Sequence, residues 1–110
     1  MSFVIDGREI ETDPEGFLRE LSDWSEDLAK AIAEKDGLTL TEGHWEVINF
    51  LRQGYAENGT VPNIRILQKL MKAEYGPEKA DSKYLYELFP YGPAKQGCRI
   101  AGLPKPTGCV

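Results

Sequence analysis

Apolar residues recur every three or four positions through the middle of the chain, a spacing that places them on one face of a helix. The longest such pattern covers residues 42–57, after the N-cap candidate Thr41 and before Asn58 and Gly59. Its apolar stripe consists of Trp45, Ile48, Leu51 and Tyr55, widened by Val47 and Phe50. The pattern predicts an amphipathic helix with one buried face.

The N-terminal third predicts a hairpin and two helices. Two short alternating segments flank Asp6 and Gly7, which suit a tight turn, so residues 3–11 are predicted to form a β-hairpin. Asp13, Pro14 and Glu15 have the order of a helix start, with a buried side formed by Phe17, Leu18 and Leu21. A second helix is predicted from Ser25 to the Asp36–Gly37 pair.

Three more helices are predicted in the second half of the chain. One covers residues 63–74 and ends before the Gly76–Pro77 pair. A short one is capped by Asp81 or Ser82 and stopped by Pro90, and a last one covers 93–101 and carries Cys98. The helices 42–57 and 63–74 resemble a helix-turn-helix unit, although the connection between them is longer than usual.

Length and composition fit one small folded domain. The chain has 110 residues and 41% apolar residues, enough to fill a core. Proline and glycine concentrate in the final 21 residues. We therefore expect a mostly α (α+β) fold, a small orthogonal helical bundle over residues 1–97 that includes the hairpin, followed by a flexible arm over residues 98–110.

Charge and targeting signals narrow the functional classes. Residues 1–87 carry all 18 acidic residues and ten basic ones, whereas residues 88–110 carry three basic residues and no acidic ones. An acidic body argues against a nucleic-acid or anionic-membrane partner. The N-terminus lacks signal-peptide features and no apolar run approaches the roughly 20 residues of a membrane span, so we expect a cytoplasmic protein.

The arm holds both cysteines, Cys98 and Cys109, the latter as the penultimate residue. A reducing cytoplasm makes a structural disulfide improbable, so pairing of these thiols would be transient and functional. With Gly102 and Gly108 as hinges, the arm could fold back for pairing or extend by about 23 Å. Lys95, Arg99 and Lys105 are the nearby cations, and cations lower thiol pKa values. The alternative is that both thiols are ordinary and that Arg99 and Lys105 only make the arm soluble.

Other chemistry has weaker support. Two cysteines and His44 fall short of a four-ligand zinc site, so we expect no metal, and His44 is interpreted as a packed structural histidine. The helix-turn-helix unit is interpreted as an ordinary helical hairpin, and a DNA-binding regulator that uses it is kept as the less favoured alternative. No catalytic triad, phosphate loop or nucleotide fingerprint occurs, and no cofactor is expected. The pattern favours a carrier or co-substrate over an enzyme that acts alone.

Four sequence motifs of this chain resemble those of a known protein family. They are KYLYELFPYGPAKQGC at 83–98, LPKPTGCV at 103–110, TEGHWEVINFL at 41–51, and Asp23–Trp24. With these motifs the chain resembles the DsrC/TusE family of sulfur-handling proteins over essentially its whole length. The resemblance implies a compact helical fold, a mobile C-terminal arm and sulfur handling at Cys109. Members that act as relays for tRNA 2-thiouridine synthesis usually lack the upstream cysteine, so Cys98 favours the branch that serves dissimilatory sulfite reductase.

The resemblance also implies a mechanism and partners. In that branch, Cys109 would enter the siroheme sulfite reductase formed by its alpha and beta subunits, take partly reduced sulfur, and form a trisulfide with Cys98. A membrane-bound DsrMKJOP-type complex would regenerate the thiols, and Arg99 and Lys105 would meet the partner surface. The alternative is a TusE-like relay that works with sulfurtransferases and needs only Cys109. Oxidation could also join two copies through Cys109.

Overall fold

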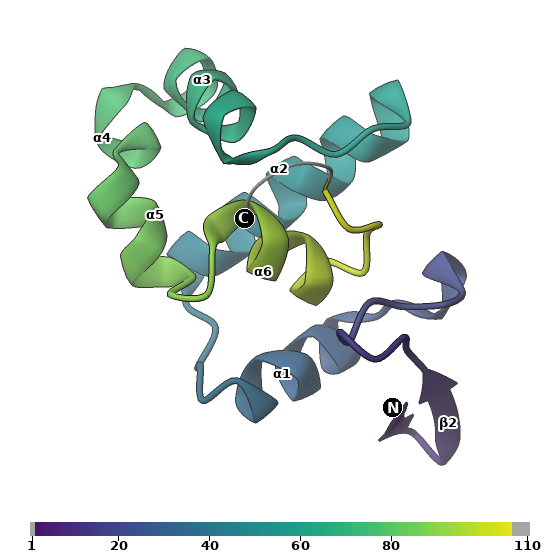
Figure 1. Cartoon of the computed structure of the whole chain (residues 1–110). Helices are drawn as coiled ribbons and strands as arrows, with labels where there is room; N and C mark the ends of the chain where they lie inside the picture. Colours follow the sequence, from purple (N-terminus) through teal and green to yellow (C-terminus); the bar gives the residue numbers. More distant parts are fainter. Residues whose placement is uncertain (1, 107–110) are drawn as a thin grey trace.

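The computed structural model describes residues 2–106 of the chain. In chain order the elements are β1 (Ser2–Ile5), β2 (Arg8–Glu11), η1 (Leu21–Asp23), α1 (Glu26–Lys35), α2 (Glu42–Asn58), α3 (Ile64–Tyr75), α4 (Pro77–Ala80), α5 (Ser82–Leu88) and α6 (Pro93–Ile100). Figure 1 shows α6 in the middle of the molecule, with α1 on one side, α3 to α5 on the other and the hairpin at one end. The expected helical fold with an N-terminal hairpin is confirmed.

The hairpin forms where the sequence predicts it. Asp6 and Gly7 both have positive φ values, 52° and 79°, as the tight turn requires. This turn sets an antiparallel register that pairs Phe3 with Ile10. Ile10 is buried and β1 contacts α1, so the hairpin is stabilised by packing on the helical body.

The prediction that a helix starts at Asp13 is wrong. The Asp13 carboxylate instead accepts the backbone N–H groups of Glu15 and Phe17, both at 2.9 Å, and Gly16 between them adopts a φ of 94°. These local bonds close a loop, because an aspartate side chain competes with helical backbone bonding. Phe17 and Leu18 are still buried, as predicted, so the apolar pattern identified core residues but not their conformation.

The later helices start and end close to the predicted residues. Ser25 caps α1 by accepting the N–H of Leu28 at 3.1 Å, and α2 ends at Gly59, which has a φ of 70°. The helix α4 was not predicted, because Gly76–Pro77 was interpreted only as the end of a helix. Proline is also favoured in the first turn of a helix, and here Pro77 starts one.

The last helix, α6, forms the centre of the core. It packs against α1, α2, α3 and α5. Most of its residues are buried: Pro93, Ala94, Gln96, Gly97, Cys98 and Ile100. A Cβ at Gly97 would lie 3.2 Å from Cδ1 of Leu51, so the small residue permits close contact with α2. The predicted helix at 93–101 is thus confirmed, and it lies inside the body rather than at its edge.

Of the predicted arm, residues 98–103 belong to this packed region. Cys98, Ala101 and Leu103 are buried, and residues 104–106 continue beyond them. The flexibility of the arm as a whole stays a prediction. None of the helices within residues 2–106 is long and apolar enough to cross a membrane.

Candidate functional site

The upstream cysteine, Cys98, is enclosed by the core. Its side chain has no exposed surface, and burial raises its pKa to about 12 because the thiolate would lose its hydration. At neutral pH it is therefore a neutral, apolar thiol in this conformation. The expectation that nearby cations lower the thiol pKa is wrong for Cys98. The other predicted sulfur residue, Cys109, and the predicted hinge Gly108 lie outside the described residues.

The predicted binding residue Arg99 is held inside the body. Its guanidinium donates two hydrogen bonds to the Asp36 carboxylate, at 2.8 and 3.1 Å. The same carboxylate accepts a bond from the buried amide of Gln96 at 2.9 Å. The Gln96 oxygen in turn accepts the N–H of Tyr91 at 2.9 Å. This paired, half-buried network joins α6 to the end of α1.

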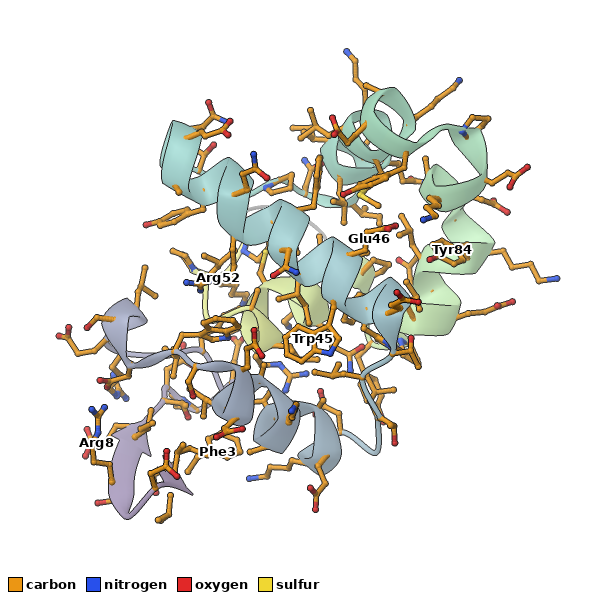
Figure 2. The ribbon with its side chains drawn as sticks, turned by 180° about the vertical axis from the view of Figure 1, so that it is seen from behind. Phe3, Arg8, Trp45, Glu46, Arg52 and Tyr84 are labelled. Atoms are coloured by element: carbon orange, nitrogen blue, oxygen red, sulfur yellow. The ribbon has the colours of Figure 1, made fainter. Side chains whose placement is uncertain are left out.

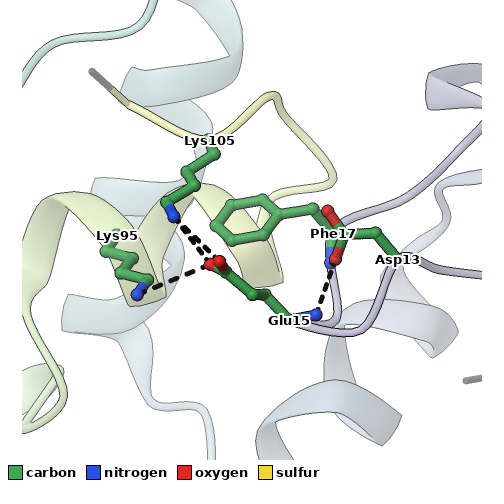
Figure 3. A network of polar contacts seen from close by, with 5 residues as sticks. All are labelled: Asp13, Glu15, Phe17, Lys95 and Lys105. Atoms are coloured by element: carbon green, nitrogen blue, oxygen red, sulfur yellow. Dashed lines mark hydrogen bonds and ion pairs between the residues drawn. The ribbon is translucent and has the colours of Figure 1, made fainter.

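Lys95 and Lys105, the other two predicted binding residues, share one acidic partner. The Lys105 ammonium lies 2.9 Å from the Glu15 carboxylate and the Lys95 ammonium lies 3.5 Å from it (Figure 3). The hydrogen bond from Lys105, followed by the charges of both lysines, keeps the Glu15 pKa below its ordinary value, although desolvation opposes this. The three predicted cations are thus all engaged within the chain, and their roles toward a partner stay predictions.

The predicted hinge Gly102 ends α6 in the left-handed conformation, with a φ of 71°. The N–H of Leu103 donates to the Cys98 carbonyl at 2.9 Å, which is the 6→1 bond of a Schellman motif. A Cβ at Gly102 would lie 2.6 Å from Cγ of Trp24. Glycine is therefore required both for its φ value and for contact with the indole.

Two side chains complete this helix end: Trp24, which was named from the sequence only as part of a family motif, and Arg52, which was not singled out. The Trp24 indole N–H donates to the Ile100 carbonyl at 2.9 Å, and the Arg52 guanidinium donates to the Ala101 carbonyl at 2.8 Å. Arg52 lies over the Trp24 ring, with Cζ 3.8 Å from its centroid, and Figure 2 shows it projecting from α2. Trp24 and Arg52 are 28 positions apart in the sequence, so only the fold brings them together.

His44 has the structural role expected of it. Its Nδ1 accepts the N–H of Thr41 at 3.0 Å, and its Nε2 donates to the Leu88 carbonyl at 2.7 Å. These bonds specify the neutral tautomer and tie the start of α2 to the end of α5. Within residues 2–106, no group of three or more His, Cys, Asp or Glu side chains could hold a metal ion.

Within residues 2–106 the site offers one thiol, that of Cys98. The body holds Cys98 in its interior and fixes the chain through Leu103, and the remaining sequence leads to Cys109. A reaction of Cys98 with another molecule therefore requires a change from this buried position.

Comparison with known proteins places this arrangement in a family. A family model described as "DsrC like protein" matches residues 4–110. The chain is 55% identical over 107 residues to the "Sulfurtransferase TusE" of Escherichia coli (strain K12), covering 97% of this chain and 98% of that protein.

Solved structures agree with this assignment. The NMR structure of Allochromatium vinosum DsrC matches with a TM-score of 0.90 and 53% identity, covering all of both chains. The oxidized gamma subunit of the dissimilatory sulfite reductase (DsrC) from Archaeoglobus fulgidus matches with a TM-score of 0.85 and 42% identity, again covering all of both chains. The chain belongs to the DsrC family.

Proposed function

We propose that this chain is a sulfur carrier and that Cys109 is the residue that bears the sulfur. The main support is its full-length similarity to proteins named sulfurtransferases and DsrC proteins. The burial of Cys98 adds to this, because a neutral thiol inside the core does not attack a sulfur donor in this conformation. Cys109 is the only other cysteine in the sequence.

The proposed transfer is thiol exchange. The Cys109 thiolate attacks the outer sulfur of a persulfide on a donor protein, an S–S bond forms to Cys109, and the donor thiolate leaves. The donor's S–S bond breaks as the new one forms, so the step is redox-neutral. A second exchange passes the sulfur to an acceptor. The chain acts as a co-substrate and is not an enzyme by itself.

Of the two branches weighed from the sequence, the relay now has the better support. Several curated relatives that match the chain over nearly its full length are named TusE, and their identity is 55% or 56%, against 42% for the Archaeoglobus gamma subunit. We therefore propose a sulfur relay between sulfurtransferases in the cytoplasm, serving tRNA 2-thiouridine synthesis. This replaces the dissimilatory role as the first candidate.

The dissimilatory role stays as the second candidate because of Cys98. Its presence fits a carrier that forms a bridge between two cysteines, and the 53% identity to the Allochromatium DsrC nearly equals that to TusE. In this role the partners would be the alpha and beta subunits of sulfite reductase and the membrane-bound DsrMKJOP-type complex. Bridge formation would require Cys98 to leave its buried position or Cys109 to reach it.

Sulfur loading separates the proposals. The reduced chain is incubated with a persulfide-bearing sulfurtransferase, and peptide mapping by mass spectrometry locates the added sulfur. We expect loading of the wild type and of Cys98→Ala but not of Cys109→Ala, and Cys98→Ala should restore 2-thiouridine in a deficient strain. Equal loading of Cys109→Ala would overturn the assignment of Cys109. If only sulfite reductase with sulfite yields a bridged product and Cys98→Ala abolishes it, the second candidate is correct.

A further inference from the structure

The carbonyl end of α6 is fully satisfied by specific donors. The last carbonyl groups of a helix have no partners within the helix and need donors from elsewhere. Backbone N–H groups of Leu103 and Gly102 serve the carbonyls of Cys98 and Arg99, at 2.9 and 3.3 Å. The next two carbonyls, which local backbone bonds do not serve, are bonded by Trp24 and Arg52.

Trp24 and Arg52 form one unit, which we name the α6 clamp. Trp24 follows η1, whereas Arg52 lies on α2, so the unit holds α6 against two separate parts of the body. The guanidinium stacks on the indole at 3.8 Å, within the range of a cation–π interaction. Its positive charge also lies at the negative end of the α6 dipole, which stabilises the helix end.

Partial burial strengthens the contacts of Arg52 and Trp24 with the end of α6. Desolvation lowers the pKa of Arg52 from its ordinary value, which means that its guanidinium is partly removed from water. The guanidinium stays charged at neutral pH, so its bond to the Ala101 carbonyl is charge-assisted. Gly102 packs directly on the Trp24 side chain, with no room for a Cβ between them. Rotation about Gly102 would therefore break its contact with the indole and the bond from the Leu103 N–H to the Cys98 carbonyl.

We propose that Trp24 and Arg52 are positioning residues for the sulfur-bearing arm, whose root they fix against the body at residues 100–102. This inference rests on the proposed carrier function. From Leu103 to Cys109 there are six further residues, which span at most about 20 Å. The clamp thus fixes the point from which the chain leads on to Cys109 and leaves Cys98 behind it in the core.

A fixed origin has a functional consequence. Because Cys109 is joined to the body, its sulfur can reach a partner site only within a limited volume. Its effective concentration at that site depends on the length of the tether. If the clamp opened, the tether would lengthen and the origin would move. Productive encounters with a partner site would then be less frequent, while the chemistry at Cys109 would be unchanged.

The test uses variants that remove single contacts of the clamp. Trp24→Phe deletes the N–H donor and keeps a ring over Gly102, and Arg52→Gln deletes the charge. The readout is hydrogen exchange of the Leu103 amide, compared with the amide of Leu67 in the core of α3. Losing a hydrogen bond that contributes about 1 kcal/mol should speed Leu103 exchange about fivefold in Trp24→Phe, and loss of the charged donor should speed it about tenfold in Arg52→Gln.

Controls distinguish clamp opening from a general loss of stability. Trp45→Phe changes another half-buried tryptophan, two helical turns before Arg52 on α2, and should leave Leu103 exchange unchanged relative to Leu67 (Figure 2). Arg52→Lys keeps the charge and should restore part of the protection. Equal acceleration of Leu103 and Leu67 in the clamp variants, or no acceleration of Leu103, would overturn the clamp.

Sulfur transfer gives the second readout. The assay uses a persulfide-bearing sulfurtransferase as donor. The clamp variants should raise KM for the donor about twofold or more and leave kcat unchanged. The reason is that residues 100–102 would then be correctly placed in only a fraction of the molecules. Unchanged KM with accelerated Leu103 exchange would overturn the positioning role. If the wild type accepts no sulfur on Cys109, the carrier function fails, and the exchange experiment still decides whether the clamp exists.

Discussion

The backbone of Gly102 lies against the indole of Trp24, close enough that a Cβ would lie 2.6 Å from Cγ and 2.8 Å from the tryptophan's own Cβ. Gly59 at the end of α2 has nearly the same backbone conformation, with a φ of 70° against 71°, but a Cβ there would meet nothing within 4 Å. The two glycines therefore separate the cost of the left-handed conformation from the cost of crowding.

Gly102→Ala should destabilise the protein more than Gly59→Ala. Alanine in the left-handed region costs about 1 kcal/mol at either position. At position 102 the clash with a packed ring adds about 2 kcal/mol, the usual range for an overpacked site. Urea unfolding of both variants measures the difference. Equal losses of unfolding free energy would mean that the Trp24 ring moves aside without cost.

Cys98 should resist alkylation in the folded protein. Burial raises its pKa to about 12 from an ordinary 9.0, so its thiolate fraction at pH 8 falls about a thousandfold. In a Cys109→Ser background, iodoacetamide at pH 8 should modify Cys98 at least this much more slowly than a free cysteine peptide. In denaturant the rates should become equal. Fast modification of the folded protein would mean that the end of α6 opens often.

The same pKa shift predicts how stability depends on pH. Above pH 9 the unfolded chain loses the Cys98 proton while the folded chain keeps it, so the folded state binds more protons and stability falls as pH rises toward 12. Between pH 9 and 10 this costs about 1 kcal/mol. Comparing Cys109→Ser with Cys98→Ala/Cys109→Ser cancels the titration of other groups, and parallel pH profiles for the two would contradict the raised pKa.

The Asp36–Arg99 pair should contribute more to stability than a surface pair. Its side chains are 13% and 17% exposed, whereas those of Asp23 and Arg8 are 28% and 67% exposed. Asp36→Asn leaves the Arg99 guanidinium partly buried without a counter-charge and should cost about 3 kcal/mol. Asp23→Asn should cost less than about 1 kcal/mol. Thermal unfolding with double-mutant cycles measures both, and similar losses would contradict the structural role of Arg99.

The sequence predicted the helices because their apolar spacing and caps act locally. Ser25, Thr41, Asp81 and Gly59 each lie at the helix end that the sequence assigned to them. The helix predicted at Asp13 failed because the aspartate used its side chain to close a loop, a choice that Gly16 makes accessible. Helix propensity does not decide whether an aspartate caps a helix or closes a loop with its side chain.

The candidate site was only partly predictable, for a different reason. Cys98 was identified from its place in the tail, but its burial depends on four helices that pack around α6. Arg99, Lys95 and Lys105 were interpreted as free cations because their partners, Asp36 and Glu15, are distant in sequence. Long-range pairing of charges leaves no signal in a single sequence.

The ion pair between Lys105 and Glu15 should hold the described part of the arm near the body. Both side chains are about half exposed, so the contact is open to solvent and salt. Glu15→Gln should increase the mobility of the Lys105 backbone, because it removes the charge that both lysines face. Backbone ¹⁵N relaxation at Lys105 measures this, and raised ionic strength should have the same effect in the wild type.

The pH dependence of this contact follows from the lowered Glu15 pKa. A carboxylate whose pKa is depressed in the folded state stabilises the fold above its unfolded pKa, and this contribution is lost as pH falls through the folded value. The Lys105 amide should therefore stay ordered at neutral pH and become mobile only in acid, below the ordinary glutamate pKa of 4.5. Glu20→Gln, a change at another exposed glutamate, is the matched control and should leave Lys105 unaffected. Equal mobility of Lys105 in the wild type and Glu15→Gln at neutral pH would show that packing of Leu103 and Pro106, both buried, orders this segment without the ion pair.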